Sequence, residues 1–313
     1  MCERVCYSNA HQPEELSGGT KKQKTQFMKV RILTMTKKII ALVLALAMIL
    51  SCTACAAGGE KKDRLAQIKE KGYIEMTTEP YWAPNEFIDP TKSGDEQYVG
   101  VDIELGKAIA EKIGVELKIV PLEFTAVQAS IVDGKYDMAI SAMAYSPTRA
   151  EAMKMSNVYQ ASDDGYGYLV REEDADKYTS IESVKDAVVV TQSGSVQESM
   201  FNDQIGKDGC KEFKLVSSMT DGYLAVAEGK ADVCITALSA ADLYAEANGG
   251  LATPDFQLEI DPNMNGTVVA MPKEGSDALC EVVNEVIAEL NAAGKIAEWE
   301  EYYKAYAKEL GIE

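Results

Sequence analysis

The sequence is poor in histidine and in basic residues, and both shortages exclude functions. Its one histidine, His11, lies in an N-terminal segment that we expect to be removed. Ser-His-Asp catalysis, Cys-His catalysis and histidine-bearing zinc sites are therefore excluded for the rest of the chain. Basic residues number 31 against 50 Asp and Glu. The sequence thus lacks the clustered basic charge that binding to nucleic acid requires.

The cysteines also lack the paired spacing of metal or redox sites. Four lie within the first 55 residues, and the other three are widely spaced, with no C-x-x-C pair among them. Spacing alone allows one disulfide among these three and does not assign it. Cys234 in an apolar strand and Cys280 on an apolar helix face favour small buried hydrophobic side chains over reactive thiols. We expect no catalytic residue, metal site or cofactor in this part of the chain.

Long hydrophobic runs are missing as well. The apolar run at 39–50 is shorter than the roughly 20 residues of a membrane-spanning helix. It follows Lys37-Lys38 and precedes small residues with two cysteines, which is the layout of a signal peptide and resembles a bacterial lipobox. We favour Cys55 over Cys52 as the lipidated residue, because two small residues precede Cys55. An uncleaved anchor is the alternative.

The N-terminal segments divide by composition. We expect a doubtful extension at 1–34, a lipoprotein signal peptide at 35–55 and a flexible tether at 56–64. The true start is then Met35 or Met28 rather than Met1. Without residues 1–55 the chain keeps 23 basic and 47 acidic residues. Such acidic charge disfavours anionic lipid, so membrane attachment should depend on the N-terminus.

The remaining chain alternates strands and helices twice. The first series predicts strands at 73–77, 115–119 and 136–141, with helices at 102–113 and 125–133, and hence a mostly parallel sheet. The same order recurs between 187 and 236. Within these series, the eight residues from Gly134 echo those from Gly229. We infer two α/β lobes of similar topology that face each other across a cleft at the carboxyl ends of their strands.

Four motifs in order resemble one family. They are Gly100-Val101-Asp102-Ile103-Glu104-Leu105-Gly106-Lys107-Ala108-Ile109-Ala110, the stretch at 78–84, the strand and loop at 137–151, and the Gly turn at 192–198. Over about residues 63–310 the chain resembles the bacterial extracellular solute-binding proteins, family 3, the substrate-binding lipoproteins of amino-acid ABC transporters.

The resemblance implies a two-lobed periplasmic-binding-protein (Venus flytrap) fold of class α/β. Two similar mixed sheets would be joined by a two-strand hinge, with lobe 1 at 65–162 plus 266–313 and lobe 2 at 163–265. It also implies a monomer without cofactor or metal, lipid-anchored to the outer face of the cytoplasmic membrane. That monomer would deliver an amino acid to an ABC permease and ATPase.

The resemblance further implies a set of ligand-binding residues. Arg149 would bind the ligand α-carboxylate through a bidentate fork. Ser141 and the backbone N–H groups near Ala142 would complete that carboxylate site. The remaining contacts would come from the aromatic rings of Trp82 and Phe124, and from Ser195 and Val196 of the second lobe.

Two positions depart from the family pattern. Ala144 replaces the usual Ser or Thr, and Ala237 replaces the Asp that usually pairs the α-ammonium. Either another carboxylate takes this role, with Glu79 the best candidate and Thr236 and Asp242 weaker ones, or the ligand lacks a standard α-amine. Glu79 favours a polar or cationic ligand.

Two other functions stay open at this point. The same fold resembles that of a periplasmic dehydratase acting on cyclic diene acids, in which Glu79 would serve as the acid or base. A surface adhesin or nutrient-sensing receptor would use the same cleft without transport.

Overall fold

The computed structural model describes residues 63–312, apart from 162–164, 262–263 and 265. The expected signal peptide and both candidate lipidation cysteines therefore lie outside the described residues. Residues 61–313 form one unit of the chain. None of the helices in the described part is long and apolar enough to cross a membrane.

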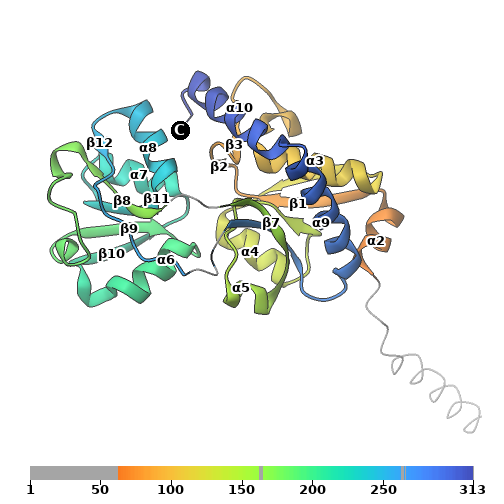
Figure 1. The fold of residues 1–313 in the computed structure, drawn as a ribbon, viewed down its shortest axis with the longest axis horizontal. Helices are drawn as coiled ribbons and strands as arrows, with labels where there is room; N and C mark the ends of the chain where they lie inside the picture. Colours follow the sequence, from red (N-terminus) through yellow and green to blue (C-terminus); the bar gives the residue numbers. More distant parts are fainter. Residues whose placement is uncertain (1–62, 162–164, 262–263, 265, 313) are drawn as a thin grey trace, which may run out of the picture. The chain divides into compact units, whose positions relative to one another are not determined.

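One five-stranded sheet anchors what we call the first lobe (Figure 1). Strand β1 runs parallel to its neighbours β5 and β6, whereas β13 runs antiparallel to β6 and β7. The sheet is therefore mixed, and the all-forward strand order of the first series accounts for only three of its members. In spatial order the strands are β5 (Glu116–Pro121), β1 (Tyr73–Thr78), β6 (Met138–Ala139), β13 (Gly266–Pro272) and β7 (Met153–Ala161).

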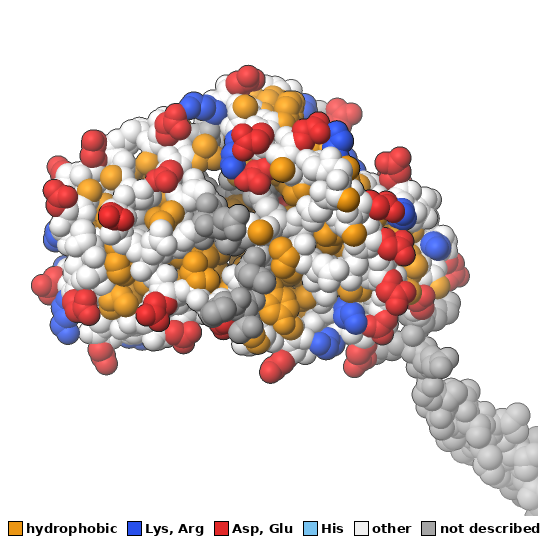
Figure 2. Space-filling view, viewed as in Figure 1, with side chains coloured by type: hydrophobic (Ala, Val, Ile, Leu, Met, Phe, Trp, Pro, Cys, Tyr) orange, Lys and Arg blue, Asp and Glu red, His pale blue; other side chains and the backbone are white. Residues whose placement is uncertain are grey.

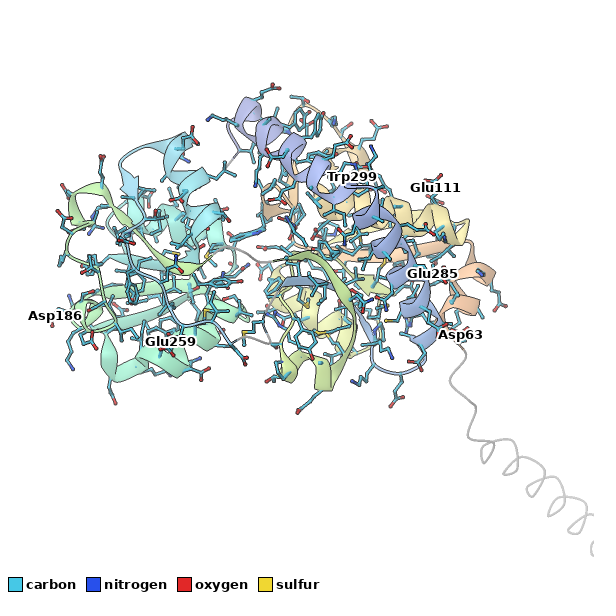
Figure 3. All side chains as sticks on the ribbon, viewed as in Figure 1. Asp63, Glu111, Asp186, Glu259, Glu285 and Trp299 are labelled. Carbon is cyan, nitrogen blue, oxygen red and sulfur yellow. The ribbon has the colours of Figure 1, made fainter. Side chains whose placement is uncertain are left out.

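Helices cover both faces of this sheet because successive strand residues point to opposite faces and the side chains on both faces are apolar. Met138 and Ile140 pack into a core with helices α3, α9 and α10, while Ala139 between them packs against α4. Charged side chains such as Glu111 and Glu285 project outward from the helical layer (Figure 3). The helices are α2 (Arg64–Lys71), α3 (Val101–Ile113), α4 (Phe124–Val132), α5 (Pro147–Ala152), α9 (Asp277–Ala292) and α10 (Lys295–Leu310).

A second five-stranded sheet anchors the second lobe. It is parallel across β10, β9 and β11 and antiparallel at β8 and β12. Its order is β10 (Glu212–Val216), β9 (Val188–Gln192), β11 (Val233–Ala237), β8 (Tyr166–Arg171) and β12 (Leu251–Ala252). Helices α7 (Met219–Ala227) and α8 (Leu238–Asn248) cover one face, and α6 (Val196–Met200) the other (Figure 1).

The two echoed segments form the same local structure in both sheets. Gly134 and Gly229 each follow a helix with φ 70°, a left-handed conformation that favours glycine. Three residues later, the carboxylate of Asp137 accepts the N–H of Glu75, and that of Asp232 accepts the N–H of Val188, both at 2.8 Å. Each aspartate thereby ties its own strand to the start of the neighbouring parallel strand, which explains the repeated spacing.

The expected two-strand hinge falls where the chain passes between the lobes, at about residues 162 and 265. Residues 162–164, 262–263 and 265 of these connections lie outside the described residues. A smaller sheet borders the first lobe and consists of β2 (Tyr81–Trp82), β3 (Glu86–Ile88) and β4 (Tyr98–Val99). The described cysteines Cys210, Cys234 and Cys280 are buried and free, in keeping with their expected role as small hydrophobic side chains.

The outer surface is acidic. Asp and Glu side chains are spread over both lobes in the space-filling view, with basic side chains between them (Figure 2). This distribution matches the net charge of −19 and leaves no basic face in that view.

Candidate functional site

A cavity of about 350 Å³ lies where the two sheets turn their strand ends toward each other. Its lining comes from both lobes and includes the eight residues that the resemblance and the Glu79 substitution propose as ligand contacts. These are Glu79, Trp82, Phe124, Ser141, Ala142, Arg149, Ser195 and Val196.

Arg149 supplies a cation to this cavity. It lies in α5, where the Ser146 hydroxyl accepts its backbone N–H. Its Nη1 donates to the Ala144 carbonyl (2.7 Å) in its own lobe, and its Nη2 to the Gly194 carbonyl (2.8 Å) in the other lobe. The guanidinium carbon lies 5.6 Å from the centre of the Phe124 ring. Burial lowers the pKa of Arg149 to about 10, so the group stays charged at neutral pH.

No carboxylate of the described residues forms an ion pair with Arg149. Its two side-chain hydrogen-bond partners are neutral carbonyls, each of which uses one of its five N–H donors. A desolvated guanidinium with donors to spare is suited to receive a carboxylate of a ligand.

Glu79 supplies the opposite charge. It follows β1, is 4% exposed, and its Oε1 accepts a hydrogen bond from Gln192 Nε2 of the second lobe (3.0 Å). Burial raises the pKa of Glu79 to about 7, with a further rise from the nearby carboxylates of Asp221 and Glu123, and the bond from Gln192 opposes it. Near neutral pH the group is therefore divided between its acid and its carboxylate form. A ligand cation would stabilise the carboxylate.

Ser141 and Ala142 form the cavity wall, and their polar groups are engaged within the protein. The Ser141 hydroxyl donates to Glu86 Oε1 (3.1 Å) and accepts the Glu79 N–H (3.0 Å). Ala142 has φ 41° and donates its N–H to Asp102 Oδ2 (2.7 Å). The N–H of Ala142 itself therefore has a partner within the protein, and the expected contribution of N–H groups near Ala142 to a ligand carboxylate stays a prediction.

The two aromatic side chains approach the cavity from different cores. Phe124 begins α4 and packs within the first lobe, where it is 7% exposed. Trp82 lies in β2 and packs against an apolar cluster of the second lobe that includes Met219 and Tyr223. They therefore present apolar surface to the cavity from two sides.

The second lobe contributes the turn before α6. Ser195 caps this helix by accepting the N–H of Glu198 (3.1 Å) and donates to the Gln192 carbonyl (2.7 Å). The Gly194 carbonyl accepts from both Arg149 and Gln128 Nε2 (3.1 Å) of the first lobe. Helix α6 has only five residues. It contributes to the cavity through the turn that precedes it and through the side chain of Val196.

Ala144 and Ala237 both line the cavity, so the two departures from the family pattern lie inside the site. They pack in one apolar cluster together with Tyr166 and Val196. Thr236 does not line the cavity, because its hydroxyl is bonded to the Tyr223 hydroxyl (2.5 Å). Asp242 reaches the lining one turn into α8, together with Glu246 and Glu300 at the outer edge.

Sequence reasoning missed two groups of the site. Glu86 lines the cavity and is 1% exposed, although the sequence shows it only as one acidic residue in a short strand. Gln192 was part of a quoted motif, but only the structure shows that its amide bridges Glu79 and the Ser217 carbonyl (3.0 Å). A glutamate beside Phe87 and Ile88 in an apolar strand was the one available signal for Glu86.

Comparisons with known proteins agree with this geometry. The arginine-binding extracellular protein ArtP of Bacillus subtilis is 24% identical over 267 residues, which cover 83% of this chain and 95% of that protein. The histidine-binding periplasmic protein of Escherichia coli is 25% identical over 263 residues, covering 81% and 92%. A substrate-binding protein of an amino acid ABC transporter from Streptococcus pneumoniae, bound to L-arginine, superposes with a TM-score of 0.71. That structure is 30% identical and covers 78% of this chain and 98% of its own.

The sequence profile of the family places the chain directly. Residues 74–306 match the bacterial extracellular solute-binding proteins, family 3. The match spans both sheets, the cavity between them and most of α10. The chain belongs to the bacterial extracellular solute-binding proteins, family 3.

Proposed function

We propose that this protein captures an amino acid with a cationic side chain in the cavity and delivers it to an ABC permease. One observation carries the proposal. Two desolvated groups of opposite charge, Arg149 and Glu79, line the same cavity, and neither has an ion-pair partner among the described residues. Because unpaired buried charge is costly, a ligand with a carboxylate and a cation would be stabilised by both groups.

The remaining lining supports the same ligand. Trp82 and Phe124 offer aromatic faces to the aliphatic and cationic parts of a side chain. Ser195 and Val196 cover the ligand from the second lobe, while Ser141 and Ala142 hold the wall beside it. Arginine-binding and histidine-binding relatives are consistent with a cationic side chain.

The α-ammonium has no side-chain carboxylate at Ala237. Within the proposal, Glu79 pairs the ligand cation, and the Ala144 carbonyl, which accepts Arg149 Nη1 (2.7 Å), is an acceptor at the Arg149 end of the cavity. The alternative is a ligand without a standard α-amine. Comparing arginine with 4-guanidinobutyrate, which lacks that amine, separates the two.

We infer that the ligand is released unchanged. Acid-base chemistry on a cyclic diene acid needs a positioned proton donor or acceptor, and Glu79 is the group that would serve. Its Oε1 is held by Gln192 across the cavity, an arrangement that suits a static contact. Incubation of the protein with arogenate or prephenate should leave both intact by mass spectrometry, and their conversion would establish the dehydratase instead.

We propose that the protein is exported and anchored by a lipid on Cys55. Family membership supports an extracellular or periplasmic location. Metabolic labelling with a fatty acid should be lost in Cys55→Ser and retained in Cys52→Ser. Retention in the first and loss in the second would move the anchor to Cys52.

Thermal shift against the twenty amino acids, 4-guanidinobutyrate, polyamines and dipeptides tests the capture proposal. A ligand at 100 times its Kd should add about 2.7 kcal/mol of stability. Arginine, lysine or histidine should raise the melting temperature, and Arg149→Ala should abolish the rise. A rise with the amine-free acid and with no α-amino acid would contradict the amino-acid assignment.

A further inference from the structure

Two further buried carboxyl groups, those of Asp102 and Glu86, lie at the wall of the cavity. They are separate from the charged pair Arg149 and Glu79. Asp102, in the first turn of α3, is fully buried. Its carboxylate accepts three hydrogen bonds, from the Ala142 N–H (2.7 Å), the Tyr159 hydroxyl (2.8 Å) and Asn85 Nδ2 (3.2 Å). Three donors stabilise the ionised form, so Asp102 is the carboxylate of this group.

Glu86 is its neighbour and faces the cavity. One oxygen, Oε1, accepts the Ser141 hydroxyl (3.1 Å), whereas no N–H or O–H of the described residues donates to Oε2. The Glu86 carboxyl group lies beside that of Asp102, within reach of a hydrogen bond. Two carboxyl groups can form such a bond only if one of them carries a proton.

The placement of that proton follows from the donors. Asp102 is already satisfied as an acceptor, and Glu86 has one oxygen that lacks any donor. A proton on Glu86 Oε2 would let this oxygen donate to Asp102, so that it would no longer be buried without a partner. Burial and the nearby charges of Asp102 and Glu79 raise the pKa of Glu86 well above its usual value, which agrees with this placement.

We infer that Glu86 and Asp102 share one proton and act as the positioning pair of the cavity wall, leaving Glu79 as the carboxylate that meets the ligand cation. The pair holds Ser141 through Glu86 and Ala142 through Asp102. This inference rests on the proposed function for its ligand, and it adds a specific role for two residues.

The wall that the pair holds reaches both charged ends of the site. Ser141 accepts the Glu79 N–H and thereby fixes the residue that faces a cation. Two residues beyond Ala142, the carbonyl of Ala144 orients Arg149 Nη1. A change at Glu86 or Asp102 therefore displaces Glu79 and Arg149 together. The titratable groups facing the pair are Glu79 and Tyr159, and the latter donates to Asp102.

The test is isothermal titration of L-arginine into the protein in buffers of different ionisation enthalpy, which counts the protons exchanged on binding. Glu86→Leu removes both hydrogen bonds and should weaken affinity about tenfold. Glu86→Gln keeps an acceptor for Ser141 and a donor for Asp102, so it should restore most of that loss. It should also release the same number of protons as wild type, because Glu86 stays neutral throughout.

Glu79→Gln is the contrasting variant. It should weaken arginine binding about 30-fold or more and bring the proton count near zero, because Glu79 is the group that ionises. If Glu86→Gln is as weak as Glu86→Leu, or if it removes the proton release, then Glu86 is an ionised ligand contact and the inference is wrong.

A spectroscopic measurement keeps the inference testable without a ligand. Infrared difference spectra of the free protein at about pH 9, where Glu79 is ionised, should show a protonated carboxylic acid band that is absent from Glu86→Gln. Absence of that band in wild type would overturn the shared proton, even if Glu86→Gln fails to fold. If neither arginine, lysine nor histidine binds, the proposed function fails, while the infrared result still decides the proton.

Discussion

The two lobes are built alike and present different chemistry to the cavity. Both sheets use the same glycine-to-aspartate joint, with Asp137 and Asp232 in equivalent hydrogen bonds. At the carboxyl ends of the strands the likeness stops. The first lobe contributes desolvated titratable side chains, namely Glu79, Glu86 and Arg149. The second contributes an amide, a carbonyl, a hydroxyl and a methyl group, from Gln192, Gly194, Ser195 and Ala237, and its two carboxylates in the lining, Asp242 and Glu246, are exposed.

The equivalent ends of β6 and β11 show how the difference arises. Ser141 follows β6 and turns its hydroxyl to Glu86 at the cavity. Thr236, at the matching place of the second lobe, bonds the Tyr223 hydroxyl in the core instead. A repeated fold thus fixes where the strand ends lie, and single residues decide whether an end recognises charge or only covers the ligand. We expect the first lobe to set specificity and the second to set closure.

The largest effect should follow removal of the first lobe's cation. Arg149→Ala should weaken arginine binding about 100-fold, because the ligand carboxylate loses its donor and the Gly194 carbonyl loses one of its two donors. Titration calorimetry measures it. Arg171→Ala is the matched control, since Arg171 bonds Asp174 and Asp232 in the second lobe. Equal losses in both variants would remove the asymmetry between the lobes.

The next effect is the pH dependence of the first lobe's carboxylate. Since the pKa of Glu79 is about 7 and a ligand cation favours the ionised form, affinity should fall as pH drops below 7 and level off above it. At pH 5.5 the Kd should be about 30-fold higher than at pH 8. Glu79→Gln should show a flat profile, and Glu111→Gln, on the outer face of α3, should keep the slope. If the Kd of Glu79→Gln still depends on pH, another group causes the pH dependence.

A smaller effect should follow from crowding the second lobe's turn. A side chain at Gly194 would lie 2.8 Å from Gln128 Nε2, at φ 74°. Gly194→Ala should weaken binding about tenfold, as the lobes cannot approach as closely. Gly229→Ala has a similar φ of 70° and open space, so it isolates backbone strain from the clash. Small-angle scattering with saturating arginine should show a less closed Gly194→Ala, and an unchanged profile would count against the closure role.

The smallest effect concerns a residue outside the cavity lining. Gln128→Ala removes one of the two donors to the Gly194 carbonyl and should weaken binding about threefold. Gln204→Ala, which removes a comparable bond to the Glu259 carbonyl, should leave affinity as it is. The loss in Gln128→Ala should appear for every ligand alike. A loss that depends on the ligand side chain would instead place Gln128 among the specificity residues.

Arg149, Phe124 and Ser195 were expected from the resemblance to the family, and each also lies next to a local signal. Arg149 follows a helix cap, Phe124 begins a helix, and Ser195 caps one, so each has a position set by its neighbours. Glu86 and Gln192 have no such signal. Glu86 meets Ser141 from 55 positions away, and Gln192 meets Glu79 from 113 positions away. Such pairs depend on how sheets pack, which periodicity does not encode.

The fold shows the same limit. The strand and helix order from 73 to 141 and from 187 to 236 was predictable because alternate residues are apolar and glycines end the helices. The antiparallel place of β13 was not, because it brings residue 270 beside residue 139. The acceptor of the Ala142 N–H was not predictable for a related reason, since Asp102 lies 40 residues earlier.

Arg149 has a practical consequence for anyone who wishes to turn this protein into a biosensor. One guanidinium grips its own lobe at Ala144 and the opposite lobe at Gly194. Ligand binding and lobe closure therefore depend on the same side chain, so a substitution of Arg149 would change both the ligand preference and the size of the sensor signal. Substitutions of Glu79 should change mainly the ligand preference, and substitutions of Gln128 mainly the size of the signal.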